Sequence, residues 1–515
     1  MNKKIKNLLL LCCIAVIAMA FYYPAFRKYF KQPPFKFYIF QTSDTHGYLN
    51  NVEDECSGDW LRLGNILKKE IDKAGGHDNC LLIDCGDTFQ GTIEASEEKG
   101  KFIVSIMNNL EYDIFVPGNH DFDFGFNNFL DRINGLNADV IAANLILEPT
   151  HLPKLTHKIL PWKLYIKNNI KIAVIGMTSP YLKYWLWGKE HEKYNVFSIS
   201  KTLQKIMPGI LETNPDIIIL AFHHGLYNSK RFPGKDNFLK SIIKKYPQIN
   251  IVFGGHTHQI YPGESLYNSS VYVQPGAHAE YFSKLEVEVD KTGKTLPLIK
   301  TELIPILPTD SPNKQLADIA SETIRKSNLK RREIVGKTNT VIDDKGIPGI
   351  NNRMSELFAN AVLRLVKADA VMATVIKAGY ELNGVITYGD IFNICPYEDT
   401  IAILSLNYVE LRKILEEQDA HKDKYRKNLG LYIVDSKSNK NRLLPSLDSH
   451  NLLPFFNEKD RINVAFSSYD VAGAGSRYPV LRKIAQRANA QAFDTQILLR
   501  DAVLKYIQDS SLKEK

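Results

Sequence analysis

The chain has 515 residues, of which 44% are hydrophobic and 24% are charged, a composition that argues against a disordered chain, a collagen-like repeat and a polytopic membrane protein. Single hydrophobic cores stop growing near about 250–300 residues, so the length predicts two folded domains. The formal net charge of +8 is modest and the basic residues are scattered, which favours a solvated surface and predicts no nucleic-acid partner.

The N-terminus has the pattern of an export signal. Met1–Lys6 is basic, and the run from Leu8 to about Tyr23 is apolar. Ala18-Met19-Ala20 offers a cleavage site, but basic residues such as Arg27 after the apolar run also fit an uncleaved membrane anchor. Residues 1–35 are therefore expected to direct the chain to the periplasm or the cell surface, either cleaved or as a membrane tether.

From residue 36 onward, short apolar runs alternate with segments of helical period, which is typical of a layered α/β domain. The predicted strands are Phe37–Phe40, Leu81–Ile83, Ile114–Val116, Val140–Ala142, Ile172–Ile175, Ile217–Leu220 and Ile251–Phe253, and the predicted helices include Leu61–Ile71 and Phe102–Leu110. Several of these strands are apolar throughout, as strands covered on both faces are. Alternating residues in Leu285–Val289 then predict a hairpin turning at Asp290–Gly293, and the domain is expected to span residues 36–308.

A polar stretch of helical pattern follows. Residues 309–333 are expected to form a linker helix because their large apolar residues are few, namely Leu316, Ile319, Ile324 and Leu329. Residues 334–515 carry their own mixed pattern, with helical Met354–Leu365 and Val409–Leu415 and strand-like Ala370–Met372 and Ile462–Phe466. They predict a second α/β domain.

Polar residues that suit metal ions follow five of the predicted strands. They are Asp44 and His46, Asp87, Asn119 with His120, His223 with His224, and His256 with His258. Open α/β sheets bind ligands beyond the carboxyl ends of their strands. Asp, His and Asn side chains are ligands for Mn²⁺, Zn²⁺ and Fe²⁺. The sequence therefore predicts a metal site at this edge of the sheet.

Spacing separates the expected ligands from their neighbours. Gly86 permits a tight turn that leaves Asp87 projecting from the strand end, as a bridging ligand requires. His223 is favoured as a ligand over His224, and His120, next to the ligand Asn119, is set apart as a catalyst. Seven ligands exceed the needs of one cation, and two cations about 3.5–4 Å apart sharing an aspartate clamp an in-line displacement at phosphorus. The predicted reaction is hydrolysis of a phosphate ester.

These motifs, in this order and spacing, resemble the calcineurin-like metallophosphoesterases. More narrowly, Asp84–Thr92, Asp121–Gly125 and Ala142–Leu145 are similar to the secreted 5′-nucleotidase family, which includes UDP-sugar hydrolases and 2′,3′-cyclic-nucleotide phosphodiesterases. The resemblance implies an α/β fold, with a four-layer metallophosphoesterase sandwich followed by a second α/β nucleotide-binding domain. It also implies a nucleotide substrate.

The resemblance further implies two divalent ions, of Mn, Zn or Fe. One would take Asp44, His46, Asp87 and His258, and the other Asp87, Asn119, His223 and His256. A hydroxide bridging the metals would attack phosphorus, and His120 would stabilise the phosphoryl oxygens or the leaving group. Asp123, rather than Asp121, would hold the His120 imidazole in its working orientation. The alternative for Asp123 is an N-terminal helix cap.

The second domain departs from the family pattern. Ala373–Gly379 stands where the family has an Asn-x-Gly-Gly-Ile-Arg-like segment, which leaves Lys377 as the nearest cation in place of arginine. Tyr469 matches one of two rings that sandwich a base in this family, and Tyr432 is a candidate for the other, with a core tyrosine as its alternative. The substrate stays open between a 5′-nucleotide and a 2′,3′-cyclic nucleotide, 3′-nucleotide or UDP-sugar. A binding protein that has lost catalysis is the non-enzyme alternative.

Overall fold

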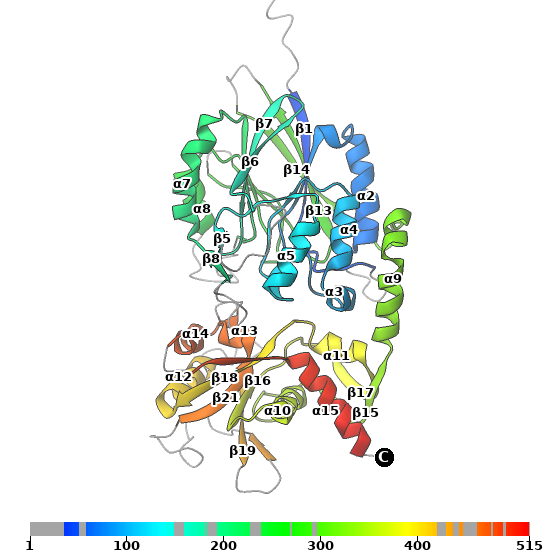
Figure 1. Cartoon of the computed structure of the whole chain (residues 1–515), viewed down its shortest axis with the longest axis vertical. Coiled ribbons are helices and arrows are strands. Elements are labelled where there is room, and N and C mark those ends of the chain that lie inside the picture. Colours follow the sequence, from blue (N-terminus) through cyan, green and yellow to red (C-terminus); the bar gives the residue numbers. More distant parts are fainter. Residues whose placement is uncertain are drawn as a thin grey trace, which may run out of the picture.

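The computed structural model describes residues 35–50, 58–148, 159–180, 182, 193–226, 238–267, 270–290, 296–419, 429–435, 442–445, 461–474, 477–487 and 491–513. The expected export segment up to residue 34 and the expected hairpin turn at 291–293 lie outside these residues. Figure 1 shows an upper body built around strands that begin with β1 and a lower body that contains the C-terminal helix α15, with α9 running along one side between them. Among the described residues, no helix has the length and apolar character needed to cross a membrane.

The upper body contains a pair of sheets. The first has the order β14 (Leu298–Pro305), β13 (Tyr281–Val289), β1 (Phe35–Thr42), β2 (Cys80–Asp84), β3 (Ile114–Phe115) and β4 (Asp139–Val140). The second has the order β11 (Ile260–Ser265), β12 (Val271–Pro275), β10 (Ile251–Phe253), β9 (Ile217–Phe222), β7 (Ile170–Met177) and β6 (Trp162–Lys167). Short strands β5 (Leu145–Leu147) and β8 (Tyr194–Val196) pair separately.

Helices cover the outer face of each sheet (Figure 1). Those on the first sheet are α2 (Trp60–Lys73), α3 (Ile93–Glu98), α4 (Lys101–Asn109) and α5 (Phe126–Gly135), and those on the second are α7 (Ile199–Glu212) and α8 (Phe238–Lys245). One apolar cluster lies between the sheets, and another lies under each helical layer. Strands β2, β9 and β10 are buried at every residue because both of their faces are covered. The predicted four-layer α/β sandwich is confirmed.

Parallel pairing fixes where the functional loops lie. Strands β1, β2, β3 and β4 run parallel, as do β7, β9, β10 and β12. The carboxyl ends of parallel strands meet at one edge of a sheet. The loops that leave β1, β2, β3, β9 and β10 therefore gather at a common end of the sandwich.

Helix α9 (Lys314–Arg331) lies within the segment expected to be a linker. The Asn313 side chain caps its first turn by accepting a hydrogen bond from the Leu316 backbone N–H. Leu316 and Ala320 are fully buried in the core of the first domain, whereas Ile319 and Leu329 are 41% and 63% exposed. One face of this helix thus packs against the upper body as an extra layer.

The lower body has a mixed sheet and a separate hairpin. The sheet has the order β20 (Arg442–Pro445), β19 (Gly430–Asp435), β16 (Ala370–Ala373), β21 (Arg461–Ser467), β18 (Thr400–Asn407) and β22 (Phe493–Leu498), and the hairpin pairs β15 (Ile334–Asp343) with β17 (Glu381–Thr387). The helices are α10 (Arg353–Leu365), α11 (Tyr388–Ile394), α12 (Tyr408–Asp419), α13 (Ser468–Val471), α14 (Pro479–Ala485) and α15 (Leu499–Lys513).

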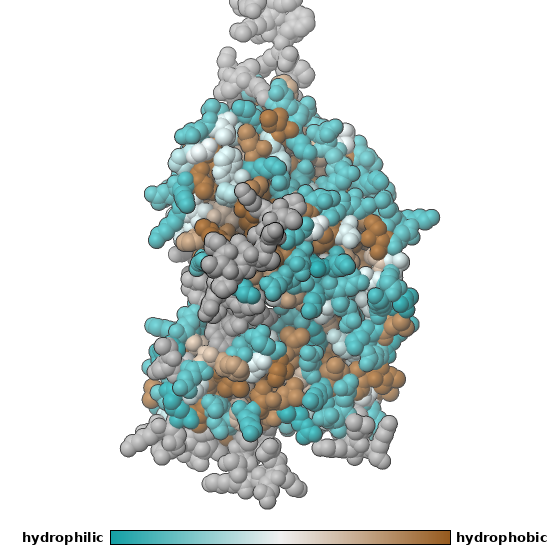
Figure 2. Space-filling model, viewed as in Figure 1, coloured by the Kyte–Doolittle hydropathy of each residue, from teal (hydrophilic) through white to brown (hydrophobic). Residues whose placement is uncertain are grey.

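Successive side chains along a strand point to opposite faces of this sheet, and each face packs in its own apolar core. In β16, Val371 and Ala373 pack with α10, α11 and α15, while Ala370 and Met372 pack with α12 and α14. The predicted second α/β domain is confirmed. Figure 2 shows that the viewed face is mainly hydrophilic over the upper body and carries more apolar side chains over the lower body.

Candidate metal centre

The expected ligands lie on sharply bent loops just beyond the strand ends. Asp44, His46, Asp87, His256 and His258 have positive φ angles of 53°, 48°, 55°, 68° and 55°. Left-handed backbone is uncommon for residues other than glycine and persists only where the surrounding structure enforces it. These loops are therefore held in a strained form at the place where their side chains converge.

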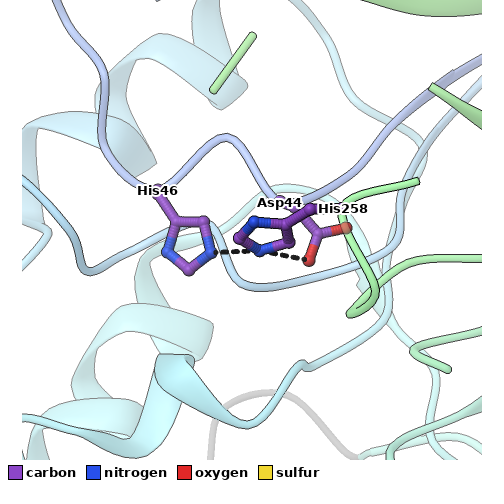
Figure 3. A group of neighbouring side chains, drawn as sticks. All are labelled: Asp44, His46 and His258. Carbon is purple, nitrogen blue, oxygen red and sulfur yellow. Dashed lines mark hydrogen bonds and ion pairs between the residues drawn. The ribbon is translucent and has the colours of Figure 1, made fainter. Parts of the chain in front are cut away.

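Asp44, His46 and His258 form a first cluster, in which their candidate ligand atoms lie within 4.8 Å of one another. Asp44 and His46 stand on the loop after β1, and His258 stands on the loop after β10. Figure 3 shows the three side chains meeting, with His258 between the other two. His258 Nε2 lies 3.1 Å from His46 Nε2 and 3.6 Å from Asp44 Oδ1. The His258 side chain is 41% exposed, so the cluster is open to solvent on that side.

Asp87, His223 and His256 form a second cluster with the same close spacing. His223 Nε2 lies 3.0 Å from Asp87 Oδ2. The Oδ1 atom of Asn119 is buried and has no hydrogen-bond partner among the described residues. Buried acceptors of this kind are rare in folded proteins. Asn119 immediately precedes His120, whose backbone N–H donates to Asp87, so an unpaired amide oxygen at this position suits a cation ligand.

Backbone carbonyls fix the orientation of two ligand imidazoles. His46 Nδ1 lies 3.0 Å from the Gln90 carbonyl oxygen, and His223 Nδ1 lies 2.6 Å from the Cys85 carbonyl oxygen. A carbonyl can only accept, so Nδ1 carries the hydrogen in both rings. The Nε2 atoms are then directed to the clusters, as in metal-ligating histidines whose other nitrogen donates to a carbonyl.

Glycines allow the loops to approach one another closely. A Cβ on Gly118 would lie 2.3 Å from Asp87 Oδ1, and a Cβ on Gly255 would lie 2.4 Å from Ser43 Oγ. Gly86 has φ of 85°, and its added Cβ would lie 2.2 Å from the Gly118 nitrogen. Only glycine fits these positions. The close loops, the orphaned amide oxygen and the mixed N/O donor set together fit a pair of divalent cations.

Burial and neighbouring charges set the protonation of the cluster. Burial and neighbouring imidazoles hold the pKa values of His46 and His256 well below their usual range, and neutral imidazole is the form that binds metals. Burial raises the pKa of Asp44 to about 7. Burial opposes the charge of Asp87 too, but His223 and His120 outweigh it and hold its pKa well below the usual range.

His120 stands beside the clusters with its own acidic partner. Its Nδ1 lies 2.8 Å from Asp123 Oδ2, and its backbone N–H donates to Asp87 Oδ1 at 2.7 Å. Burial disfavours the imidazolium, yet Asp123 and Asp87 raise the pKa of His120 to about 10. Asp123 is not the N-cap of α5, because Gly125 holds that position and no side chain caps the first turn. The pair is therefore a charged donor fixed next to the metal clusters.

Asp121 has a structural role that sequence reasoning missed. Its buried carboxylate accepts hydrogen bonds from the backbone N–H groups of Asp87 (2.9 Å), Thr88 (2.8 Å), Phe89 (3.0 Å) and Gly118 (2.7 Å). It thus ties the loop that carries Asp87 to the loop that carries Asn119. In the sequence, nothing about an aspartate next to the expected catalyst His120 indicates that it accepts hydrogen bonds from two loops.

The expected substrate residues lie at one end of the lower sheet, with one exception. Tyr469, in α13 after β21, is 39% exposed and lies under the Arg477 guanidinium. Lys377 follows β16 and lies over the Tyr380 ring. Strands β16 and β21 are parallel, so both residues follow carboxyl ends of neighbouring strands. No contact joins Lys377 to the metal clusters among the described interactions.

Tyr432 corrects an expectation. Its ring is 3% exposed in the core of the lower body, and its hydroxyl accepts from the Gly349 backbone N–H and lies 2.5 Å from Ser355 Oγ. Strand β19 pairs Tyr432 with Val371, which places the ring on the covered face under α10. The residue is a core tyrosine and cannot stack on a substrate.

Tyr397 is the aromatic residue that the sequence did not single out. It precedes β18 in the Pro396–Thr400 turn, is 38% exposed, and stacks against the His120 ring with centroids 6.1 Å apart. The turn resembles the family's Pro-Phe-x-Asn-Thr segment, in which an aromatic residue stands at the position of Tyr397. This resemblance was the signal in the sequence that could have marked Tyr397 as a candidate.

Comparison with known proteins agrees with this architecture. Residues 37–260 match the calcineurin-like phosphoesterase family, and residues 334–482 match the 5′-nucleotidase C-terminal domain. A snake venom 5′-nucleotidase from Naja atra is 24% identical over 441 residues, covering 74% of this chain and 78% of that protein. A 2′,3′-cyclic-nucleotide 2′-phosphodiesterase/3′-nucleotidase from Haemophilus influenzae is 24% identical over 246 residues, covering 45% of this chain and 37% of that protein.

Solved structures show the shared fold. A 5′-nucleotidase precursor from Thermus thermophilus has a TM-score of 0.66 at 17% identity, covering 93% of this chain and 97% of that one. The fold and the site define a calcineurin-like metallophosphoesterase, a class of phosphoric ester hydrolases. Because a 5′-nucleotidase C-terminal domain follows, the chain belongs to the 5′-nucleotidase family of these enzymes.

Proposed function

We propose that the protein is an exported hydrolase that removes phosphate from nucleotides with two divalent metal ions. The observation that carries this proposal is the convergence of two His/Asp clusters at one end of the sandwich, with His120 beside them. Asp87 would be shared by both ions, and Asn119 would complete the second set. Ions held there supply an activated water at neutral pH and neutralise charge on the phosphoryl group.

The side chains around the clusters would then handle the substrate. The His120 imidazolium would donate a hydrogen bond to a phosphoryl oxygen or to the leaving oxygen, where negative charge develops. Asp123 holds Nδ1 of that ring at 2.8 Å, which leaves Nε2 as the proposed donor. Glycines at positions 118 and 255 keep the loops close enough for this arrangement.

Aromatic rings on the second domain would bind the base. Tyr397 and Tyr469 are each more than a third exposed, and Tyr397 adjoins His120. Base stacking on an aromatic ring contributes about 1–3 kcal/mol and tolerates any base. We propose these tyrosines as the base contacts in place of Tyr432, with Lys377 as a weaker cation at the same end of the sheet.

A second candidate is hydrolysis of a 2′,3′-cyclic nucleotide, a 3′-nucleotide or a UDP-sugar. The segment Ala373–Gly379 favours it, because it carries Lys377 where the family has an arginine, and lysine lacks the bidentate grip of arginine on phosphate. The Haemophilus influenzae relative carries a cyclic-nucleotide phosphodiesterase name. The metal chemistry is the same in both candidates.

The proposed site of action is outside the cytoplasm. The basic and apolar pattern of residues 1–23 supports export, whether the segment is cleaved or serves as a membrane tether. The matched Naja atra protein is named as a snake venom enzyme, which agrees with a family member that acts after export.

The experiment uses purified protein stripped of metal by a chelator and reloaded with Mn²⁺, Zn²⁺ or Fe²⁺. Phosphate release is measured from 5′-AMP, 3′-AMP, 2′,3′-cyclic AMP and UDP-glucose, together with metal content. We expect two ions per chain and fastest turnover of 5′-AMP. Fastest turnover of 3′-AMP, 2′,3′-cyclic AMP or UDP-glucose would select the second candidate. Two bound ions with no turnover of any nucleotide would contradict both and leave a binding protein.

A further inference from the structure

Arg500, the second residue of α15, is a charged side chain buried at the boundary between the domains. Only 2% of its side chain is exposed. Its guanidinium lies 4.7 Å from the Phe392 ring centroid and pairs with the carboxylate of Glu398, which is 5% exposed. An ion pair of this kind is costly to bury unless further hydrogen bonds satisfy it. The partners that satisfy Arg500 are therefore informative.

Those partners belong to the turn that carries Tyr397. Arg500 Nη1 donates to the carbonyl oxygens of Cys395 at 3.2 Å and Tyr397 at 3.5 Å. The neighbouring Leu499 backbone N–H donates to the Asp399 carbonyl oxygen at 2.8 Å. The start of α15 thus holds the backbone of this turn on both sides of Tyr397.

The same group of contacts reaches the first domain. Ser96, in α3, receives a hydrogen bond from Arg500 Nη2 at 3.1 Å and donates to Glu398 Oε1 at 3.1 Å. Gln90 Nε2 donates to the Pro396 carbonyl oxygen at 3.1 Å, while the Gln90 carbonyl accepts from the ligand His46. The turn is therefore joined to a metal-binding loop by contacts through Gln90.

We propose that Arg500 is a positioning residue that fixes Tyr397 beside His120 and so sets the preference for nucleoside esters over simple phosphate esters. The proposal rests on the proposed function, because it needs Tyr397 to contact the nucleoside. An ester with no base does not use that contact. Loss of Arg500 therefore weakens binding of nucleotides and leaves the metal chemistry intact.

The test uses the full chain loaded with Mn²⁺ and compares its kinetics on 5′-AMP with its kinetics on p-nitrophenyl phosphate, an ester that has no base. Arg500→Met alone leaves the buried Glu398 carboxylate without the Arg500 charge, so the main variant is Arg500→Met with Glu398→Gln, which removes both charges. Arg331→Met is the matched control, because Arg331 Nη2 also contacts a buried glutamate of α3, Glu94, at 3.1 Å.

We expect the double variant to raise KM for 5′-AMP by about tenfold, within the range of a lost base stack, with kcat/KM for p-nitrophenyl phosphate changed less than about twofold. The same pair of changes made in a Tyr397→Ala chain should alter neither value further, because the positioned ring is already absent. A merely structural role would act equally in both backgrounds.

The outcomes separate the proposals. In a folded double variant, equal losses on both substrates would overturn the proposed role of Arg500. An unchanged KM for 5′-AMP would overturn it too. In either case, turnover of 5′-AMP by the wild-type chain would still support the proposed function. A wild-type chain that holds metal and cleaves p-nitrophenyl phosphate but no nucleotide would overturn both.

Discussion

The metal centre and the substrate end of the second domain are built in opposite ways. At the metal centre, mostly buried side chains stand on strained loops whose backbones are fixed by other buried groups, such as the carboxylate of Asp121. At the substrate end, Tyr469 and Tyr397 are partly exposed, and Lys377 contacts only the Tyr380 ring in the described interactions. If the proposed function holds, the reaction would depend on this rigid geometry, whereas the choice of substrate would depend on a few partly exposed rings.

This difference predicts that changes at the metal centre affect every substrate, while changes in the second domain affect nucleotides selectively. The largest effect is expected for Asp87→Asn. A neutral amide in place of the shared carboxylate should release both ions and lower turnover by roughly 10³-fold or more, because metal chemistry supplies several kcal/mol of transition-state stabilisation. Metal content by mass spectrometry and phosphate release measure the result.

Asp78→Asn is the matched control, since Asp78 is exposed in the first domain and should keep both ions. Full metal occupancy in Asp87→Asn would refute the shared-ligand assignment.

His120→Asn should retain the ions and lose most turnover. A positioned proton donor typically contributes about 10²–10⁴-fold to the rate, and His120 is a neighbour of the clusters rather than a member. We expect kcat to fall equally for 5′-AMP and p-nitrophenyl phosphate, measured with metal content in the same samples. His77→Asn, at a surface ion pair with Glu111, should behave as wild type. Loss of an ion from the His120 variant would instead make it a ligand.

Tyr469→Ala should discriminate between substrates. Removing one stacked ring costs about 1–3 kcal/mol, equivalent to roughly 5–150-fold in KM for nucleotides. Turnover of p-nitrophenyl phosphate should stay within about twofold. Tyr267→Ala, at an exposed tyrosine of the first domain, serves as the control. Similar losses on both substrates would mean that the two regions are not separate in function.

The expected ligands could be proposed from sequence because their chemistry and position coincide. Asp, His and Asn residues directly after apolar strands must lie at the carboxyl edge of a parallel sheet. The layered α/β class followed from the same strands, since they are apolar on both faces, whereas the four-layer sandwich was implied by the family resemblance. The role of Asp121 could not be predicted from the sequence, because hydrogen bonds between a carboxylate and backbone N–H groups require no particular residue types or spacing.

The exposure of the aromatic residues could not be predicted from the sequence in the same way. Whether a tyrosine is buried depends on strand register, and the pairing of Tyr432 with Val371 puts its ring under α10. Tyr397 lies in a turn held by Arg500, which stands 103 positions later in the chain. Neither contact is visible in a local pattern. The burial of a candidate substrate tyrosine therefore comes from the structure, whereas candidate metal ligands could be proposed from their positions after predicted strands.

The smallest effect is expected for Tyr432→Phe, which tests the corrected role of this residue. The change keeps the ring and removes the hydroxyl that meets the Gly349 backbone N–H and Ser355 Oγ. A lost buried hydrogen bond costs about 0.5–1.5 kcal/mol net, so the unfolding free energy should fall by that amount in urea denaturation. KM for 5′-AMP should not change, because the ring faces the core. A raised KM with unaltered stability would return Tyr432 to the substrate side and remove the contrast between the two regions.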